Sequence, residues 1–280
     1  MGRTLGGSSA INLGMVIFPG KAEFEAWSAL GNTGWDHEGI LPYLRKFHTY
    51  TGPSDKVKEQ LHYQGDSELH GTDGPVQLSF GEDYLPFHAA WPLTFEALGY
   101  KLTGDPISGI AVGPFSSAGA VDSSTKTRSH AAAAYYSRDV AKRPNLRVLT
   151  EVFVEKVVLE ENKGSVEATG VQFVGKDGTR RVMFSRREVI LAAGAFKTPQ
   201  ILELSGIGSS ELLTSHGIPV FIDNANVGEN LQDHGLVCGS WEVADGQVSG
   251  DSIRDPEVAA AAMQLYQASR SGPLSQVPFV

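Results

Sequence analysis

The sequence predicts an α/β fold, and two observations carry this prediction. The apolar run at residues 188–193 predicts a buried strand that leads into a turn at Gly194. A helix is expected directly afterwards, over residues 200–204, so that a strand, a glycine turn and a helix follow one another as they do in α/β sheets. In addition, Asp177-Gly178 lies between two β-prone runs, a pattern that is typical of a β-hairpin.

Helices are expected where apolar residues recur three or four positions apart and a glycine or proline bounds the run. Residues 22–30 place Phe24 and Trp27 on one face, and Gly31 follows them. Four consecutive alanines predict one continuous helix over residues 129–141, because alanine has the highest helix propensity. The same reasoning predicts helices over residues 38–47, 87–98 and 255–271.

Strands and loops account for most of the remaining chain. Alternation of apolar and polar residues predicts a short strand over residues 76–80. Residues 51–75 are polar and rich in turn-forming residues, so they are expected to form a surface excursion, and residues 103–117 are expected to be a loop. Runs rich in valine and leucine predict further strands within residues 146–159, 170–174 and 181–184.

The composition excludes several classes of function. The 280 residues include 23 basic and 32 acidic side chains, which give a formal net charge of −9. This balance argues against nucleic-acid and anionic-membrane partners, because both attract clustered lysine and arginine. No apolar run approaches the roughly 20 residues that a membrane-spanning helix needs. With Cys238 as its one cysteine, the chain has no internal disulfide.

Metal and hydrolase chemistry have little support in the sequence. No histidine pair shares a helix face with an acidic residue at the spacing of metal ligands, so no metal site is predicted. The serine pairs at residues 116–117 and 123–124 lack the G-x-S-x-G context of a hydrolase nucleophile. None of the eight histidines is assigned as a catalytic base.

Glycine is over-represented, with 32 residues in 280, whereas about 7% is usual. The first glycine cluster spans residues 2–12 and also contains one arginine and the hydroxyls of Ser8 and Ser9. Glycine allows backbone amides to approach a ligand closely, and hydroxyl donors complete such a cradle. The cluster therefore predicts a backbone wrapped tightly around an anionic group.

This cluster and a second one carry a resemblance to a known family. The two signatures read Gly2-Arg3-x-Leu5-Gly6-Gly7-Ser8-Ser9-x-Ile11-Asn12 and Gly194-Ala195-x-x-Thr198-Pro199-x-Ile201-Leu202-x-x-Ser205-Gly206-Ile207-Gly208. Segments between and after them also match, among them His70-Gly71-x-x-Gly74-Pro75, Arg143-Pro144-Asn145-Leu146 and Val227-Gly228-Glu229-Asn230-Leu231-Gln232-Asp233-His234. Over nearly its whole length the chain resembles the glucose–methanol–choline (GMC) oxidoreductases.

The resemblance implies a domain organisation. Residues 1–236 correspond to an FAD-binding, doubly wound, three-layer α/β domain that is incomplete, because its N-terminal βαβ unit is expected upstream of Gly2. Residues 50–145 correspond to an excursion on the substrate side. Residues 237–280 would begin a substrate-binding domain of α+β type, built on an antiparallel sheet.

The resemblance also implies a cofactor, FAD, and the residues that line it. His234 is expected to be buried or to lie beside the flavin, and Gly14 and Met15 are expected near the isoalloxazine ring. Val154 matches the valine whose backbone meets the adenine, and Gly194 and Ala195 are expected on the adenosine side. The remaining cofactor-binding residues implied by the first signature are Arg3, Thr4, Gly6, Gly7, Ser8 and Asn12.

The implied reaction is hydride transfer from the CH–OH carbon of a small-molecule alcohol to the flavin. No catalytic residue is assigned within the chain, since the family's catalytic histidine and its partner are expected downstream of Val280. The alternative is a catalytically incompetent fragment or pseudo-enzyme that lacks both the dinucleotide fingerprint and the histidine pair. The alcohol, the electron acceptor, the oligomeric state and the localisation stay open.

Overall fold

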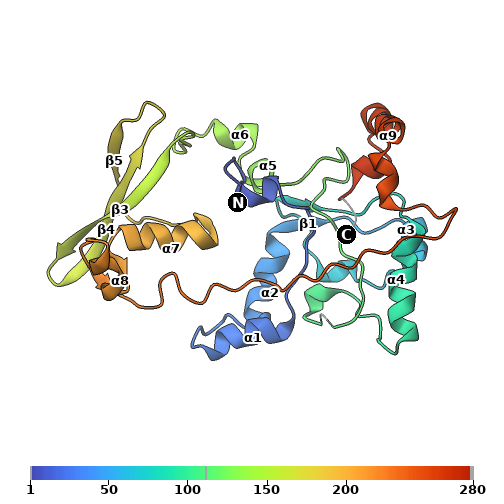
Figure 1. The fold of residues 1–280 in the computed structure, drawn as a ribbon, viewed down its shortest axis with the longest axis horizontal. Coiled ribbons are helices and arrows are strands. Elements are labelled where there is room, and N and C mark those ends of the chain that lie inside the picture. Colours follow the sequence, from blue (N-terminus) through green and yellow to red (C-terminus); the bar gives the residue numbers. More distant parts are fainter. Residues whose placement is uncertain (1, 111, 278–280) are drawn as a thin grey trace. The chain divides into compact units, whose positions relative to one another are not determined.

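The computed structural model describes residues 2–110 and 112–277 (Figure 1). The chain divides into two compact units. The first unit combines Met1–Arg143 with Trp241–Val280, and the second unit is Pro144–Ser240. In the described ranges, no helix is long and apolar enough to cross a membrane.

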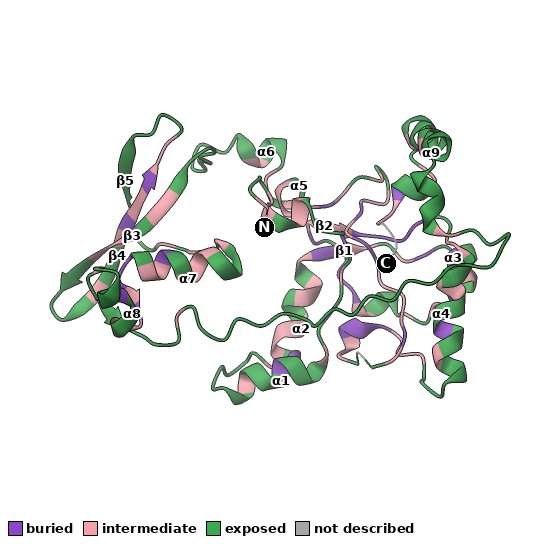
Figure 2. Ribbon diagram, viewed as in Figure 1, coloured by how far each residue is buried: buried purple, intermediate pink, exposed green. Residues whose placement is uncertain are grey.

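Helices make up most of the regular secondary structure of the first unit. Its predicted helices are confirmed at four places, with boundaries that differ from the expected ones by one or two residues. Figure 2 shows that its buried residues gather around the two short strands, whereas α4 and α9 are largely exposed. The helices of this unit are α1 (Lys21–Ala29), α2 (His37–Lys46), α3 (Asp55–Leu61), α4 (Pro86–Ala97), α5 (Ala131–Tyr135), α6 (Arg138–Ala141) and α9 (Pro256–Ser269).

Two short parallel strands lie at the centre of the first unit. Strand β1 (His48–Tyr50) directly follows α2, and its partner is β2 (Val76–Leu78), which confirms the strand expected over residues 76–80. The register pairs His48 with Val76 and Tyr50 with Leu78. A parallel pair needs a crossover connection, and α3 lies within this one.

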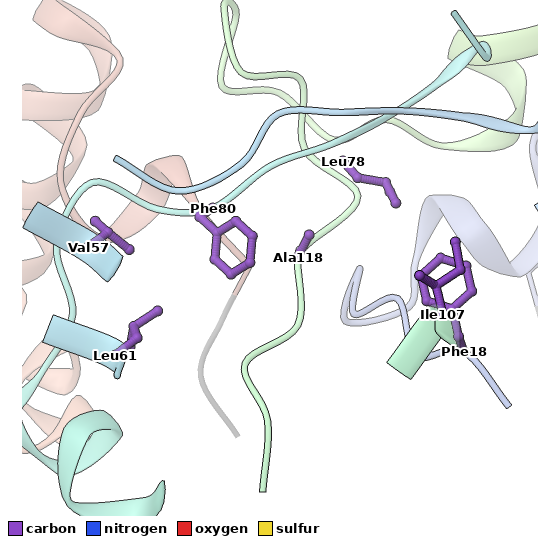
Figure 3. Packing of buried hydrophobic residues seen from close by; sticks show 7 residues of the cluster. All are labelled: Phe18, Val57, Leu61, Leu78, Phe80, Ile107 and Ala118. Atoms are coloured by element: carbon purple, nitrogen blue, oxygen red, sulfur yellow. The ribbon is translucent and has the colours of Figure 1, made fainter. Parts of the chain in front are cut away.

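The expectation that residues 51–75 form only a surface excursion is wrong. Ser54 caps α3 by accepting a hydrogen bond from the Val57 amide, and Val57 and Leu61 are 0% and 4% exposed. Their spacing of four residues places both side chains on one helix face. The polar and charged residues between them make this apolar face hard to recognise in the sequence. Figure 3 shows both side chains directed toward Phe80, and each such burial stabilises the fold by about 1.5–3 kcal/mol.

The loop expected over residues 103–117 also contributes to the core. Asp105 caps a short 3₁₀ helix, Pro106–Ser108, and Ile107 within it is 0% exposed. The hydrophobic cluster therefore combines residues from helix, strand and loop segments (Figure 3). Its buried members are Phe18, Val57, Leu61, Leu78, Phe80, Ile107 and Ala118.

The helix predicted over residues 129–141 is interrupted. The structure has α5 and α6 instead, with Tyr136 between them at φ −126° and ψ 53°, outside the helical region. Ser137 then begins α6, because its hydroxyl accepts a hydrogen bond from the Val140 amide at 3.3 Å. Serine favours helix N-caps over helix interiors, and here this preference outweighs the propensity of the alanines.

A buried polar chain links three segments of the first unit. Nε2 of His70 lies 2.7 Å from Oδ2 of Asp105, and Nδ1 of His70 lies 3.0 Å from Nε2 of His48. The Tyr50 ring stacks on His70 at 3.8 Å between centroids. Burial raises the pKa of the Tyr50 hydroxyl well above its usual range. These contacts hold β1, the Gly71 turn and the Asp105 cap together in the core.

The second unit is built on an antiparallel sheet in the order β3 (Phe153–Asn162), β4 (Ser165–Val174), β5 (Arg180–Phe184). The hairpin expected at Asp177-Gly178 is confirmed, with Gly178 at φ 72° in its turn. Helix α7 (Gly194–Leu204) is tied to β3 through the Ser205 hydroxyl, which accepts a hydrogen bond from the Val157 amide at 2.8 Å. The remaining elements of this unit are α8 (Ser210–Ser215) and a parallel pair, β6 (Ile207–Gly208) with β7 (Ile222–Asp223).

The buried strand expected over residues 188–193 is wrong. This segment has no strand pairing among the described residues, and Ile190 is 78% exposed. Helix α7 begins at Gly194 rather than at residue 200, and the Thr198 hydroxyl within it accepts a hydrogen bond from the Ala193 amide at 3.1 Å. An apolar run becomes a buried strand only where neighbouring strands can pair with it.

The α/β class is confirmed, but the described ranges contain no doubly wound parallel sheet. Their parallel strands form two short pairs, and their largest sheet is antiparallel. The doubly wound arrangement therefore stays a prediction. The domain boundary at residues 236 and 237 also stays a prediction, since the compact units divide the chain after Arg143 and Ser240 instead.

Replacing Ile107 by alanine should lower the free energy of unfolding of the first unit by about 2–5 kcal/mol, because it leaves a cavity in the core. Ile110→Ala is the matched control, since Ile110 is 59% exposed and its truncation should change stability by less than about 0.5 kcal/mol. Urea unfolding of both variants measures the difference. Equal losses would contradict the placement of Ile107 in the core.

The structure also predicts how His48 titrates. Burial is the main cause, and neighbouring His70 the second, of a pKa lowered from 6.5 to about 4, whereas the backbone of Leu44 and the charge of Asp105 act in the opposite direction. Because the folded-state pKa lies below the unfolded value, the contribution of His48 to stability is complete above pH 6.5 and is lost as the pH falls through 4. This loss is on the order of 3 kcal/mol. Imidazole NMR signals should place the His48 midpoint near pH 4, and a midpoint near 6.5 would contradict the buried neutral ring.

Candidate cofactor site

The glycine-rich turn at residues 2–12 closes on itself. The Gly7 amide donates to the Thr4 carbonyl at 2.9 Å, and the Gly2 amide donates to the Ser8 hydroxyl at 3.2 Å. Gly6 and Gly7 have φ values of 90° and 57°, a region that glycine adopts readily. A Cβ atom on Gly2 would lie 2.4 Å from the Gly7 carbonyl oxygen. Gly2 is therefore required by the close approach of the two ends of the turn, and Gly6 and Gly7 are favoured by their positive φ values.

A segment more than one hundred residues later supports this turn. The Ser9 hydroxyl donates to the Gly6 carbonyl at 2.6 Å and accepts a hydrogen bond from the Ala131 amide at 2.9 Å. A Cβ atom on Gly6 would lie 2.7 Å from Nδ1 of His130. Nη1 of Arg128 donates to Oδ1 of Asn12 at 2.8 Å. Sequence reasoning missed residues 128–131, because a lone arginine before an alanine run carries no recognisable signal.

Gly14 and Met15 continue from the turn into the body of the first unit. Gly14 is buried at φ 77°, and its carbonyl accepts a hydrogen bond from the Ala120 amide at 2.7 Å. Met15 pairs with Gly119 in an isolated antiparallel bridge and is 38% exposed. A cavity of about 230 Å³ opens beside Gly14, and its polar lining includes Lys126, Arg128, Tyr266 and Gln276.

The outer side of the turn is accessible and polar. Arg3, Thr4, Ser8 and Asn12 are exposed. No atom lies within 4 Å of the position that a Cβ of Gly7 would take. A backbone without side-chain obstruction, flanked by hydroxyls and one guanidinium, can approach the phosphate oxygens of a dinucleotide. The turn therefore fits an anionic cofactor.

Val154, Gly194 and Ala195 lie in the second unit. Val154 is half-buried in β3 opposite Phe173, next to an irregularity in the register with β4. Gly194 has φ 85° and opens α7, and Ala195 follows it in the first turn. Both are exposed, so the helix start presents small residues and backbone amides. The structure thus brings the residues of the first signature together in one turn of the first unit. Val154, Gly194 and Ala195 belong to the second unit.

Of the two placements expected for His234, the buried one is wrong, and the placement beside the flavin stays a prediction. The residue is exposed, and its backbone amide bonds only to the neighbouring Asp233 carboxylate, at 2.8 Å. Every residue of the surrounding stretch 228–240 is also exposed. The described part of the chain holds no group of three or more histidine, cysteine, aspartate or glutamate side chains that could bind a metal ion.

Comparison with known proteins adds independent evidence. The sequence model of the GMC oxidoreductase family matches residues 1–236. The dehydrogenase citC of Monascus ruber is 36% identical over 279 residues, which cover 98% of this chain and 44% of that protein. Human mitochondrial choline dehydrogenase is 37% identical over 235 residues, which cover 83% of this chain and 36% of that protein.

Solved structures agree with the sequence relatives. An FAD-dependent oxidoreductase from Chaetomium thermophilum superposes with a TM-score of 0.85 at 33% identity, over 97% of this chain and 46% of that one. A fungal aryl-alcohol oxidase gives a TM-score of 0.84 at 26% identity, again over 97% of this chain and 46% of the other. The chain thus spans less than half the length of these relatives. By its two signatures, its glycine turn and this match over 236 residues, the chain belongs to the GMC oxidoreductase family.

Proposed function

We propose that the chain supplies part of the FAD-binding site of an oxidoreductase that acts on the CH–OH group of a small-molecule alcohol. The observation that carries this proposal is the self-closed turn, whose accessible side combines the open position at Gly7 with the exposed side chains of Arg3, Thr4 and Ser8. Membership of the GMC family supports FAD as the group that the turn holds.

When bound, FAD supplies the acceptor for a hydride from the alcohol carbon. The residues of the chain hold and orient this cofactor. Backbone amides of the turn and the Ser8 hydroxyl offer hydrogen bonds to phosphate oxygens, and the Arg3 guanidinium adds a positive charge. The start of α7, with Gly194 and Ala195, offers further amides, and Val154 offers the backbone of β3.

The relatives support the substrate class without selecting one substrate. Their names include a choline dehydrogenase, an aryl-alcohol oxidase and a formate oxidase. Both alcohols in these names carry the CH–OH group that the proposal requires. Oxidase and dehydrogenase chemistry both occur among them, so the electron acceptor is not part of the proposal.

Flavin content of the purified chain tests the proposal. The protein of residues 1–280 should bind FAD, measured as flavin absorbance per mole of protein after incubation with FAD and gel filtration. Gly7→Val should abolish this binding, because the new side chain fills the open face of the turn. Gly178→Val is the matched control, since Gly178 also has positive φ and open surroundings but lies in a distant hairpin. A folded chain that takes up no FAD would favour the fragment or pseudo-enzyme alternative.

Asn12→Ala should weaken FAD binding by about 1–3 kcal/mol, the usual cost of removing one partner of a polar contact. Titration of the protein with FAD, followed by flavin fluorescence, measures this change. The circular dichroism spectrum serves as the control for folding. An unchanged affinity in a folded Asn12→Ala protein would remove Asn12 from the cofactor site.

A further inference from the structure

The orientation of the Asn12 side-chain amide is fixed by two donors. Oδ1 of Asn12 accepts hydrogen bonds from Nη1 of Arg128 at 2.8 Å and from the Gly14 amide at 3.0 Å. A flipped amide would place its NH₂ group against both of these N–H groups, so only the observed orientation is compatible with the geometry. A carbonyl oxygen has two lone pairs, and both are used here.

The Nδ2 group of Asn12 is consequently the part of the side chain that can bind a ligand. It makes no hydrogen bond within the described residues, and Asn12 is exposed. An amide nitrogen donates two hydrogen bonds and accepts none. The turn therefore offers donors at this position, which suit a carbonyl, ring-nitrogen or phosphate acceptor.

Arg128 is held firmly enough to impose this orientation. It lies in a hairpin in which Val121 pairs with Arg128, and the Ser129 amide donates to the Ala120 carbonyl at 2.8 Å. The same hairpin bonds to Gly14, because the Ala120 amide donates to the Gly14 carbonyl at 2.7 Å. Nη1 of Arg128 also reaches the Ser9 carbonyl, at 3.4 Å. The backbone of Arg128 is thus held by its pairing with Val121, and its guanidinium is held by two acceptors of the turn, Oδ1 of Asn12 and the Ser9 carbonyl.

We propose that Arg128 is a positioning residue for the cofactor: it occupies Oδ1 of Asn12 and thereby directs the two Nδ2–H donors toward acceptor atoms of bound FAD. This inference rests on the proposed function, because it names a determinant of the same site. It assigns a role to a residue that both glycine signatures leave out. Because Arg128 acts through Asn12, replacing Arg128 should weaken FAD binding only while the Asn12 amide is present.

Four variants test the proposal through the dissociation constant for FAD, measured by fluorescence titration of the apoprotein. Asn12→Asp keeps both acceptor contacts to Arg128 and Gly14 but replaces the outward donors, and it should weaken binding about tenfold or more. Arg128→Met should weaken binding about three- to tenfold. Arg128→Lys, which retains one positive donor, should recover most of this loss. Arg138→Met is the control for charge, since Arg138 is exposed on α6 and makes no hydrogen bond or ion pair with the described residues of the turn.

A double variant separates positioning from a general effect on stability. In an Asn12→Ala background, Arg128→Met should cause no further loss of FAD affinity, because the amide that it orients is gone. Additive losses would overturn the proposal. The urea midpoint of the apoprotein should be the same for Asn12→Asp and the parent. A midpoint that falls in parallel with FAD affinity would indicate a purely structural contact and would also overturn it.

A measurement without FAD distinguishes failure of this inference from failure of the proposed function. In the parent apoprotein, NMR should show a scalar coupling across the hydrogen bond from the Gly14 amide nitrogen to the Asn12 side-chain carbonyl carbon, and Arg128→Met should weaken this coupling as the amide begins to flip. If the parent binds no FAD but this coupling behaves as expected, the proposed function fails while the orienting role of Arg128 stands. If this coupling is already absent in the parent, the orienting role fails whatever the FAD affinity.

Discussion

The hydrogen bond from the Ala131 amide to the Ser9 hydroxyl is the contact on which the candidate site depends. Glycine-rich segments lose more conformational entropy on folding than other segments, so a turn of this kind needs partners outside itself. The Ser9 hydroxyl supplies one by joining the Gly6 carbonyl to the start of α5. These contacts fix the shape of the turn without using its outer side. The outer side can therefore remain accessible to a ligand.

The core that carries residues 128–131 is itself organised around polar groups. His70 and Asp105 have side chains that are 4% and 6% exposed, and His48 is 0% exposed. Buried polar groups of this kind are costly unless they find partners, and here both ring nitrogens of His70, Nε2 of His48 and the Asp105 carboxylate each have one. The chain of contacts brings together residues that are 35 positions apart, which the short parallel pair β1–β2 could not do alone.

Much of the fold and the family could be predicted from the sequence, and the failures have physical causes. Periodicity located α1, α2, α4 and α9, and the turn residues located the β4–β5 hairpin. The prediction failed for residues 188–193, where an apolar run depends on strand neighbours that the local sequence does not reveal. It also failed for Val57 and Ile107, because a short capped helix and a single 3₁₀ turn bury too few residues to produce a recognisable pattern.

The candidate site divides in the same way. Signature residues were found because glycine and hydroxyl clusters reflect a local backbone requirement. Arg128 and His130 were missed because their role comes from a tertiary contact across 116 or more positions. Burial of His234 was predicted wrongly because a motif indicates the identity of a residue better than its exposure. Residues whose role depends on the local backbone can thus be predicted from one sequence, whereas residues that support them through tertiary contacts cannot.

The first unit is assembled from two separated stretches of chain, and this has a consequence for how the protein folds during synthesis. Val277 packs against Gly14 and Gly119, and the Tyr266 hydroxyl donates to the Lys126 carbonyl at 3.0 Å. These contacts cannot form until the ribosome has added the intervening second unit, whose residues are contiguous. At a synthesis rate of about 5–20 residues per second, residues 1–143 remain for several seconds without their contacts to residues 241–280. The second unit can therefore complete its hairpins first, and the unit that begins the chain is the last to close.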